Sequence, residues 1–376
     1  MTIERYLKKQ IVSDLKEKMV FLGGPRQVGK TTLAKSLMNN KKDQYLNWDL
    51  EQDKHLILKK GLNIDSNLII LDEIHKYKNW RSLVKGYYDK YYPDLNILVT
   101  GSARLDYFRK GGDSLVGRYH YLRLHPLSLM ELNKNPNKSD LDALIKHGGF
   151  PEPFYKQSEV FTSRWQIERV SRVITQDLRD LEKVNEISLI ELLAQALVLR
   201  VGSSLSIKSL QEDLEVSPHT VNRWIEILEN LYYCYRISPF GKEKMKAVKK
   251  AQKLYLWDWS EVESEGARFE NLVASHLLKF CHFQNDTLGL KTELRYYKNT
   301  VTEKEIDFIV LQKNKPLFAV ECKTGEKDLS KTLVNDGKRL GIPKLFQVHL
   351  GKKESGHEST GKILPFTVFC KELNIP

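Results

Sequence analysis

A glycine-rich stretch near the N-terminus has the residue types and the spacing that bind phosphate. Residues 24–32 read Gly24-Pro25-Arg26-Gln27-Val28-Gly29-Lys30-Thr31-Thr32 and contain the pattern G-x-x-x-x-G-K-[ST] in full. Glycines let such a loop wrap around a triphosphate, so that peptide N–H groups and a helix N-terminus face the negative charge. We expect Lys30 to reach the outer phosphates and the Thr31 hydroxyl to hold a bound Mg²⁺. These residues predict a nucleoside triphosphate site.

An acidic pair downstream supplies the second part that such a site needs. The apolar run 68–71 is typical of a strand buried on both faces of a parallel sheet, and Asp72 and Glu73 follow it directly. At that position we expect Asp72 to contact the Mg²⁺ shell and Glu73 to polarise the attacking water. The pair therefore predicts hydrolysis as well as binding of the nucleotide.

Two further polar positions have a functional and a structural interpretation each. Ser102 or Thr100, at the end of a predicted strand over residues 95–99, can sense the γ-phosphate, or they close the strand as a polar turn. Arg118 is a candidate arginine finger for the nucleotide of a neighbouring subunit, and its alternative role is a surface salt bridge.

A second set of carboxylates lies near the C-terminus. Glu270 falls on a predicted amphipathic helix, while Asp307, Glu321 and Lys323 fall on two predicted strands, 305–310 and 317–323, joined by a turn near Lys315-Pro316. In such a hairpin Asp307 and Glu321 can lie side by side and hold Mg²⁺ or Mn²⁺, which prefer oxygen ligands. Lys323 can then orient water or stabilise developing charge. The set predicts metal-assisted cleavage of a phosphodiester.

The elements that position these groups can be read from apolar periodicity. A strand over 19–22 and a helix over 31–38 flank the glycine-rich loop, and residues 205–237 follow a helix-turn-helix pattern that ends in a strand. On its second helix the polar side chains 219, 220, 222 and 223 are expected to face outward, where they contact DNA or form a spacer surface. Six lysines crowd the next segment and favour a polyanion track: Lys242, Lys244, Lys246, Lys249, Lys250 and Lys253.

Composition limits the class of protein. The 376 residues carry a formal charge of +12, and 41% are hydrophobic, as in an ordinary globular chain with phosphate-rich partners or a basic surface. No apolar stretch has the length of a membrane span, and the first residues lack a signal-peptide pattern. The four cysteines are scattered, which favours a reduced, cytoplasmic protein.

Several motifs in a fixed order carry a resemblance to a known family. They are residues 24–32, Leu-Asp-Glu at 71–73, Thr-Gly-Ser at 100–102, Gly-Arg at 117–118, Pro-Leu-Ser at 126–128 and Gly-Gly-Phe-Pro-Glu at 148–152. Together they resemble AAA-type ATPases of bacteria and archaea with an appended C-terminal domain, a group that includes the junction ATPases that bind branched DNA. The resemblance implies ATP as ligand, a five-stranded core, a helical lid and a homo-oligomeric ring such as a hexamer.

The C-terminal carboxylates resemble those of the PD-(D/E)xK nucleases. Glu270 matches the helical acid, Asp307 the central metal ligand, and Glu321 with Lys323 the E-x-K, whereas Ile306 stands where proline is usual. The expected fold class is α/β, with an AAA+ P-loop core (1–125), a helical lid (126–183), a winged helix-turn-helix with the basic segment (184–260) and a restriction-endonuclease-like domain (261–376).

Three hypotheses for function follow. The first is an ATP-hydrolysing protein that binds branched or structured DNA and cuts it with a metal-dependent nuclease-like domain. In the second, the same machine binds or remodels DNA and its nuclease-like domain is non-catalytic. In the third, the chain is a nucleotide-controlled switch that binds protein partners.

Overall fold

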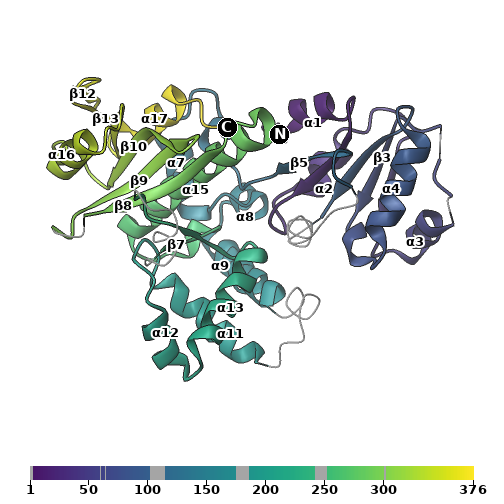
Figure 1. Ribbon diagram of the computed structural model, residues 1–376, viewed down its shortest axis with the longest axis horizontal. Helices are drawn as coiled ribbons and strands as arrows, with labels where there is room; N and C mark the ends of the chain where they lie inside the picture. The colour runs from purple at the N-terminus through teal and green to yellow at the C-terminus, as the bar shows by residue number, and fades with distance from the viewer. Residues whose placement is uncertain are drawn as a thin grey trace. The chain divides into compact units, whose positions relative to one another are not determined.

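The chain divides into two compact units, Met1–Pro126 and Leu127–Pro376, each with its own sheet (Figure 1). The computed structural model describes residues 3–59, 61–63, 65–101, 115–174, 186–241, 252–299 and 302–376. Ser102 and the lysines from Lys242 to Lys250 lie outside these residues.

The first unit is built on a five-stranded sheet in the order β2-β3-β4-β1-β5, with parallel pairing throughout. Its strands are β1 (Met19–Gly23), β2 (Gln44–Asn47), β3 (Leu68–Asp72), β4 (Asn96–Thr100) and β5 (Tyr119–Arg123). Every residue of β1 and β3 is buried, as expected for central parallel strands. Because parallel strands end at one edge of a sheet, the polar residues that follow them are brought together there. The predicted parallel-sheet core is confirmed.

Helices cover both faces of this sheet. They are α1 (Lys8–Asp14), α2 (Lys30–Lys35), α3 (Glu51–Leu58) and α4 (Trp80–Tyr91). The apolar side of α4, with Trp80, Val84 and Tyr87, packs in one cluster with Phe21 of β1 and Ile69 of β3. Val20 and Ile70 alternate with these strand residues and so face the opposite side of the sheet. They are also fully buried, outside that cluster. The sheet is therefore a central layer that fixes the loops at its edge.

The second unit begins with short helices that have clear sequence signals at their starts. They are α6 (Leu129–Leu132), α7 (Lys138–His147), α8 (Pro151–Lys156) and α9 (Glu159–Arg172). Ser128 with Glu131, and Asn137 with Asp140, form capping boxes, and Pro151 occupies the first turn of α8. This helical segment is the one in which the lid was predicted.

Three helices and a two-stranded ribbon follow. They are α11 (Ile187–Val198), α12 (Ile207–Leu214), α13 (Pro218–Asn230), β6 (Cys234–Ile237) and β7 (Lys253–Leu256), and the two strands pair antiparallel. The Ser217 hydroxyl caps α13, and the buried side of that helix includes Val221, Trp224 and Leu228. The strand predicted at the end of residues 205–237 begins at Cys234, after Tyr232, whose left-handed φ of 58° does not fit an extended strand.

The chain ends in a six-stranded mixed sheet in the order β12-β13-β11-β10-β9-β8. Its elements are α15 (Glu265–Leu288), β8 (Thr292–Lys298), β9 (Glu305–Gln312), β10 (Lys315–Lys323), α16 (Lys331–Arg339), β11 (Leu345–His349), β12 (Ser355–His357), β13 (Gly361–Pro365) and α17 (Phe366–Glu372). The β9–β10 turn is Lys313-Asn314, both with positive φ, as a two-residue hairpin turn requires. Lys315-Pro316, predicted near the turn, instead starts β10, beside a register shift that tolerates the missing proline N–H.

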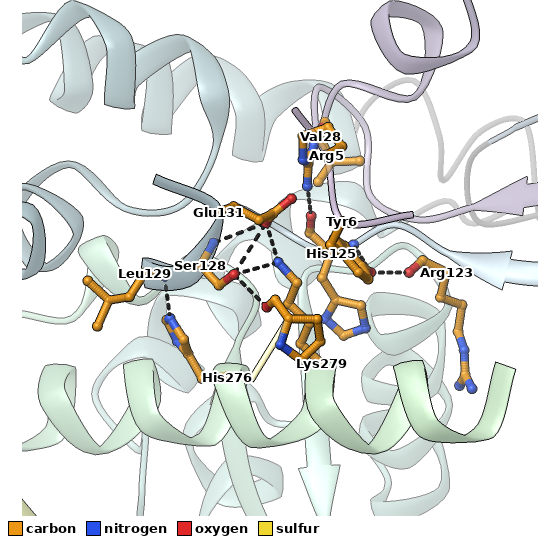
Figure 2. Close-up of polar contacts among 11 residues, drawn as sticks. Arg5, Tyr6, Val28, Arg123, His125, Ser128, Leu129, Glu131, His276 and Lys279 are labelled. Atoms are coloured by element: carbon orange, nitrogen blue, oxygen red, sulfur yellow. Dashed lines mark hydrogen bonds and ion pairs between the residues drawn. The ribbon is translucent and has the colours of Figure 1, made fainter. Parts of the chain in front are cut away.

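A buried polar network fixes helix α15 against the segment around α6 (Figure 2). The ammonium of Lys279 pairs with the Glu131 carboxylate and donates to the Ser128 hydroxyl at 2.9 Å, and both charged side chains are 2% exposed. One turn earlier, His276 Nε2 accepts the Leu129 N–H at 3.2 Å. Since breaking a buried pair leaves an uncompensated charge, this network sets the position of α15 and of Glu270 on it.

The stability of the second unit should depend on pH through His276. Burial lowers the pKa of His276 to about 3, against about 6.5 in an unfolded chain. As the pH falls, the imidazole is therefore protonated in the unfolded state before it is protonated in the folded state. The free energy of unfolding is therefore expected to fall by up to about 1.4 kcal/mol per pH unit below about pH 6.5. Calorimetric melting of wild type and His276→Gln from pH 7 to pH 5 should show a flatter profile for the variant. The exposed His219→Gln is the control, and parallel profiles for wild type and His276→Gln would contradict the assignment.

Candidate functional site

The glycine-rich loop joins β1 to α2 and takes a shape that needs its glycines. Gly24 has φ 139°, and a Cβ there would lie 2.4 Å from the Leu124 carbonyl oxygen. Gly29, just before α2, has φ 97°. The Lys30 ammonium folds back over the loop and donates to the carbonyls of Gly24 at 2.9 Å and Pro25 at 2.6 Å. The predicted phosphate-binding residues thus form one loop with its lysine directed into it.

Asp72, at the end of β3, is the centre of a set of hydroxyl contacts. Its Oδ2 accepts from Thr31 at 2.9 Å and from Tyr45 at 2.7 Å, and its Oδ1 accepts from Thr100. Asp72 is only 4% exposed. The oxygens of Thr31 and Asp72 lie side by side, which is the donor set that Mg²⁺ with bound phosphates would use. The residues present therefore fit Mg²⁺-ATP.

Glu73 is held in an unusual backbone position beside this set. Its φ is 56°, a left-handed value, and its Oε2 is buried without a hydrogen bond, 3.5 Å from His75 Nε2 and 3.7 Å from Lys76 Nζ. Burial raises the pKa of Glu73, and the charges of Lys30 and Lys76 oppose that rise. A carboxylate whose Oε2 makes no hydrogen bond, directly after Asp72 at the edge of the sheet, has the chemistry expected of the group that polarises water.

The other predicted site residues of the first unit are Thr100, Ser102 and Arg118. Thr100 contacts Asp72 through its hydroxyl, so its side chain belongs to the site, whereas Ser102 lies outside the described residues. Arg118 forms an ion pair with Asp89 at 2.7 Å, which is the surface salt bridge named as its alternative role. An assignment of Arg118 as an arginine finger remains a prediction.

Two residues of the nucleotide site were missed by sequence reasoning. Tyr45 on β2 binds Asp72, and Lys35 of α2 lies 3.9 Å above its ring centre. Arg5, 8% exposed, donates to the carbonyl of Val28 in the loop at 2.6 Å and also to the His125 carbonyl (Figure 2). Neither residue belongs to a spaced motif, and the residues that accept their hydrogen bonds, Asp72 and Val28, lie 27 and 23 residues away along the chain.

The C-terminal carboxylates also come together. On the β9–β10 ladder Phe308 pairs with Val320, so the next residues along the two strands are Asp307 and Glu321. Asp307 Oδ2 accepts the Cys322 N–H at 2.8 Å, and Lys323 Nζ lies 2.7 Å from Glu321 Oε1. Glu321 is 7% exposed, and its other oxygen, Oε2, is buried without a hydrogen bond.

Glu270 reaches the same cluster from helix α15. Its Oε1 accepts the Tyr255 hydroxyl at 2.7 Å and lies 3.6 Å from the ammonium of Lys253. Burial raises the pKa of Glu270 and of Glu321 to about 7, with the charge of Asp307 adding to each rise. Asp307 thus lies between the other two acids: it shares the Lys253 ammonium with Glu270 and stands beside Glu321 on the neighbouring strand.

Lys253 corrects one sequence prediction. It was counted in the polyanion track, yet it is 3% exposed and its ammonium lies 2.7 Å from Glu305 and 4.0 Å from Asp307. Burial works to lower the pKa of Lys253, but the surrounding Glu270, Asp307 and Glu305 raise it instead. Lys253 is therefore a buried counter-ion of the carboxylates and is not a surface contact for DNA.

The donor chemistry at this cluster suits one divalent ion better than a dedicated metal cage. Among the described residues, no three His, Cys, Asp or Glu side chains are grouped as a metal site. Mg²⁺ commonly binds through one or two carboxylates and keeps several waters. Asp307 and Glu321, the latter with a spare buried oxygen, supply that smaller donor set.

Three family models match the chain in succession. They are an AAA domain over residues 16–133, a domain of unknown function (DUF8612) over 138–261 and a domain of unknown function (DUF4143) over 265–369. The first match covers the loop, Asp72 and Glu73. The chain thus contains an AAA-type ATPase domain, and such a domain implies ATP with Mg²⁺ as its ligands.

Similar proteins in other organisms span most of the chain. A protein of Mycobacterium tuberculosis described as uncharacterized is 21% identical over 89% of this chain and 77% of its own length. An uncharacterized protein of Methanocaldococcus jannaschii is 22% identical over 88% of this chain and 80% of its own. An uncharacterized protein of Haemophilus influenzae is 22% identical over 84% of this chain and 85% of its own length. None of these descriptions names an activity.

Solved structures match with low overall superposition. A Signal Transduction ATPase with Numerous Domains (STAND) protein of Pyrococcus horikoshii is 14% identical and has a TM-score of 0.27, covering 74% of this chain and 45% of that one. Bacteroides Pif1 bound to ssDNA is 15% identical with a TM-score of 0.23, covering 38% of this chain and 49% of that one.

Helix length and composition bear on membrane insertion. None of the helices described here is both long and apolar enough to cross a bilayer.

Proposed function

We propose that this protein hydrolyses ATP to act on DNA, and that its C-terminal carboxylates form a metal-dependent nuclease site for branched or structured DNA. The observation that carries the ATPase part is the contact between Thr31 and Asp72, with Lys30 directed into the same loop. In this proposal the chain assembles into a homo-oligomeric ring, such as a hexamer, in the cytoplasm. The scattered spacing of the four cysteines in the sequence supports a reducing compartment.

The ATPase chemistry follows from the positions of the side chains. Lys30 and the loop N–H groups would hold the phosphates, while Thr31 and Asp72 would fix the Mg²⁺ that neutralises their charge. Glu73 would orient the attacking water through its spare oxygen, and Thr100 connects that edge to the next strand. Arg118 and Ser102 are the residues proposed to complete the site, Arg118 from a neighbouring subunit.

The DNA-binding part is proposed to be the segment 184–260, interpreted as a winged helix-turn-helix. The exposed side of α13 carries His219 and Arg223, while its opposite side is buried. Arg236 forms an ion pair with Glu229 at 2.6 Å, so its charge is already balanced within the protein. The phosphate contacts would therefore come from α13 and from the lysines that precede β7.

The nuclease part is proposed to have a restriction-endonuclease-like fold. The hairpin that aligns Asp307 with Glu321 and places Lys323 beside Glu321 supports this proposal. A divalent ion at these two acids would polarise a phosphodiester, and Lys323 would hold the water or the developing charge.

A second candidate function has its own supporting observation. Glu270, expected to be the third acid of the site, is already occupied by Tyr255 and Lys253. With Glu270 engaged by protein groups, fewer acids are left to bind a metal ion. This favours the alternative in which the C-terminal domain binds DNA without cleaving it. The protein would then be an ATP-dependent DNA-binding or remodelling machine.

One experiment separates these functions. ATP hydrolysis and strand cleavage are measured together on linear, forked and four-way junction DNA with Mg²⁺ or Mn²⁺. We expect DNA to stimulate the ATPase and junction or forked DNA to be cut. Stimulation without cleavage of any substrate would support the remodelling function, and an ATPase indifferent to DNA, with no DNA retention at low salt, would leave the protein-binding switch.

A further inference from the structure

The carboxylate cluster already contains a cation of its own. The ammonium of Lys253 lies within 4.0 Å of three acids, Glu305, Glu270 and Asp307, and the side chain is 3% exposed. The ring centre of Tyr296 lies 5.5 Å from the same nitrogen and adds a cation–π contact. A buried ammonium surrounded in this way supplies a positive charge among these oxygens.

Strand β7 fixes this lysine in position. Lys253 pairs with Ile237 in the β6–β7 ladder, and Tyr255, two residues further on the same side of the strand, donates to Glu270. Both groups that occupy Glu270 thus come from one strand. Glu270 Oε1 faces two protein donors, while Glu321 Oε2 is buried without a hydrogen bond.

The charges of the cluster agree with this arrangement. Counted as ionised, four carboxylates, with Glu305 included, face the ammonium groups of Lys253, Lys323 and Lys298, the last of them 3.6 Å from Glu305, which leaves a formal charge of −1. This net negative charge favours a bound cation. Without Lys253 the same oxygens would carry −2 and would have no cation between Glu270, Glu305 and Asp307.

We propose that Lys253 is a built-in cation that limits this cluster to a single divalent ion, held by Asp307 and Glu321. Glu270 is then a positioning residue for Lys253 and is no metal ligand. This inference rests on the proposed metal-binding role of the C-terminal domain, and it names which of its acids bind the ion and which hold the lysine.

Calorimetric titration of the full chain with Mn²⁺, without nucleotide, tests the number of ions. Wild type is expected to bind one Mn²⁺ at the cluster, and Lys253→Met is expected to bind one more than wild type. Lys298→Met is the matched control, since Lys298 contacts Glu305 at 3.6 Å from a more exposed position and its loss should add no ion. Lys253→Arg, which keeps the charge, should also add none.

Two acid variants keep the test decisive if Lys253→Met does not fold. Glu270→Gln should retain one Mn²⁺ with a Kd within about threefold of wild type, whereas Glu321→Gln should weaken binding by tenfold or more. A tenfold loss in Glu270→Gln, or an unchanged ion count in a folded Lys253→Met, overturns the inference. If wild type binds no Mn²⁺ while Lys253→Met binds one, the proposed nuclease function fails and the role of Lys253 as the resident cation stands.

Discussion

Lys30→Ala is expected to reduce ATP hydrolysis by about 100-fold or more, because the Lys30 ammonium is directed into the glycine-rich loop, where it would neutralise the outer phosphates. Its ammonium now rests on the carbonyls of Gly24 and Pro25, so it is already directed along the loop and needs little rearrangement to meet a phosphate. The measurement is steady-state phosphate release with saturating Mg²⁺-ATP.

The control for this variant is Lys78→Ala, which removes an exposed lysine of the same unit. Thermal melting with and without Mg²⁺-ATP adds a second readout, since a ligand that binds the folded state raises the melting temperature. We expect Lys30→Ala to lose that rise and Lys78→Ala to keep it. An ATPase rate in Lys30→Ala close to that of wild type would reject the loop as the hydrolytic site.

Lys323→Ala is expected to abolish DNA cleavage while ATP turnover stays within about twofold of wild type. Lys323 contacts Glu321 at 2.7 Å, at the end of β10 where the spare oxygen of that acid lies. Loss of a group that stabilises charge in the transition state commonly costs about 100- to 1,000-fold in rate. The two proposed sites lie in separate units of the chain, so one activity is expected to be lost without the other. Gel analysis of end-labelled junction and forked DNA measures the cleavage.

Lys315→Ala is the matched control, because Lys315 lies exposed at the opposite end of the same strand. It should leave both activities unchanged. Equal cleavage by Lys323→Ala and wild type would mean that the nuclease chemistry is performed elsewhere or by a contaminant. Failure of wild type itself to cut any substrate would remove the nuclease and favour the remodelling ATPase.

The features that could be predicted from sequence are those encoded by neighbouring residues. The glycine-rich loop, the buried strand before Asp72 and the β9–β10 hairpin each depend on a short run of residues whose types report local geometry. Their side chains meet because parallel strands end at one edge and hairpin strands alternate in register. The expected placement of Thr31 and Asp72 around one Mg²⁺, and of Lys323 with Glu321 on one strand, follows from these two rules.

Residues that act across long sequence separations were missed or misread. Lys253 looked like one more member of a basic run, and only its packing against α15 and β9 shows that it is a buried counter-ion. Tyr45 and Arg5 contribute to the nucleotide site from segments without a motif. In each case the signal is a contact between distant elements, which the types and spacing of neighbouring residues do not encode.

The position of Lys253 and Tyr255 on β7, ahead of the C-terminal family match, has a practical consequence for the choice of fragments of this protein. The third family match begins at residue 265, yet β7, which carries both residues, ends at Leu256. A fragment cut at that match would carry Glu270, Asp307, Glu305 and Glu321 without their internal cation or their tyrosine donor. In such a fragment the acids would repel one another and bind additional metal ions. The metal dependence measured for the fragment would then differ from that of the full chain. Recombinant fragments of this region should therefore start ahead of β6, at Cys234 or earlier.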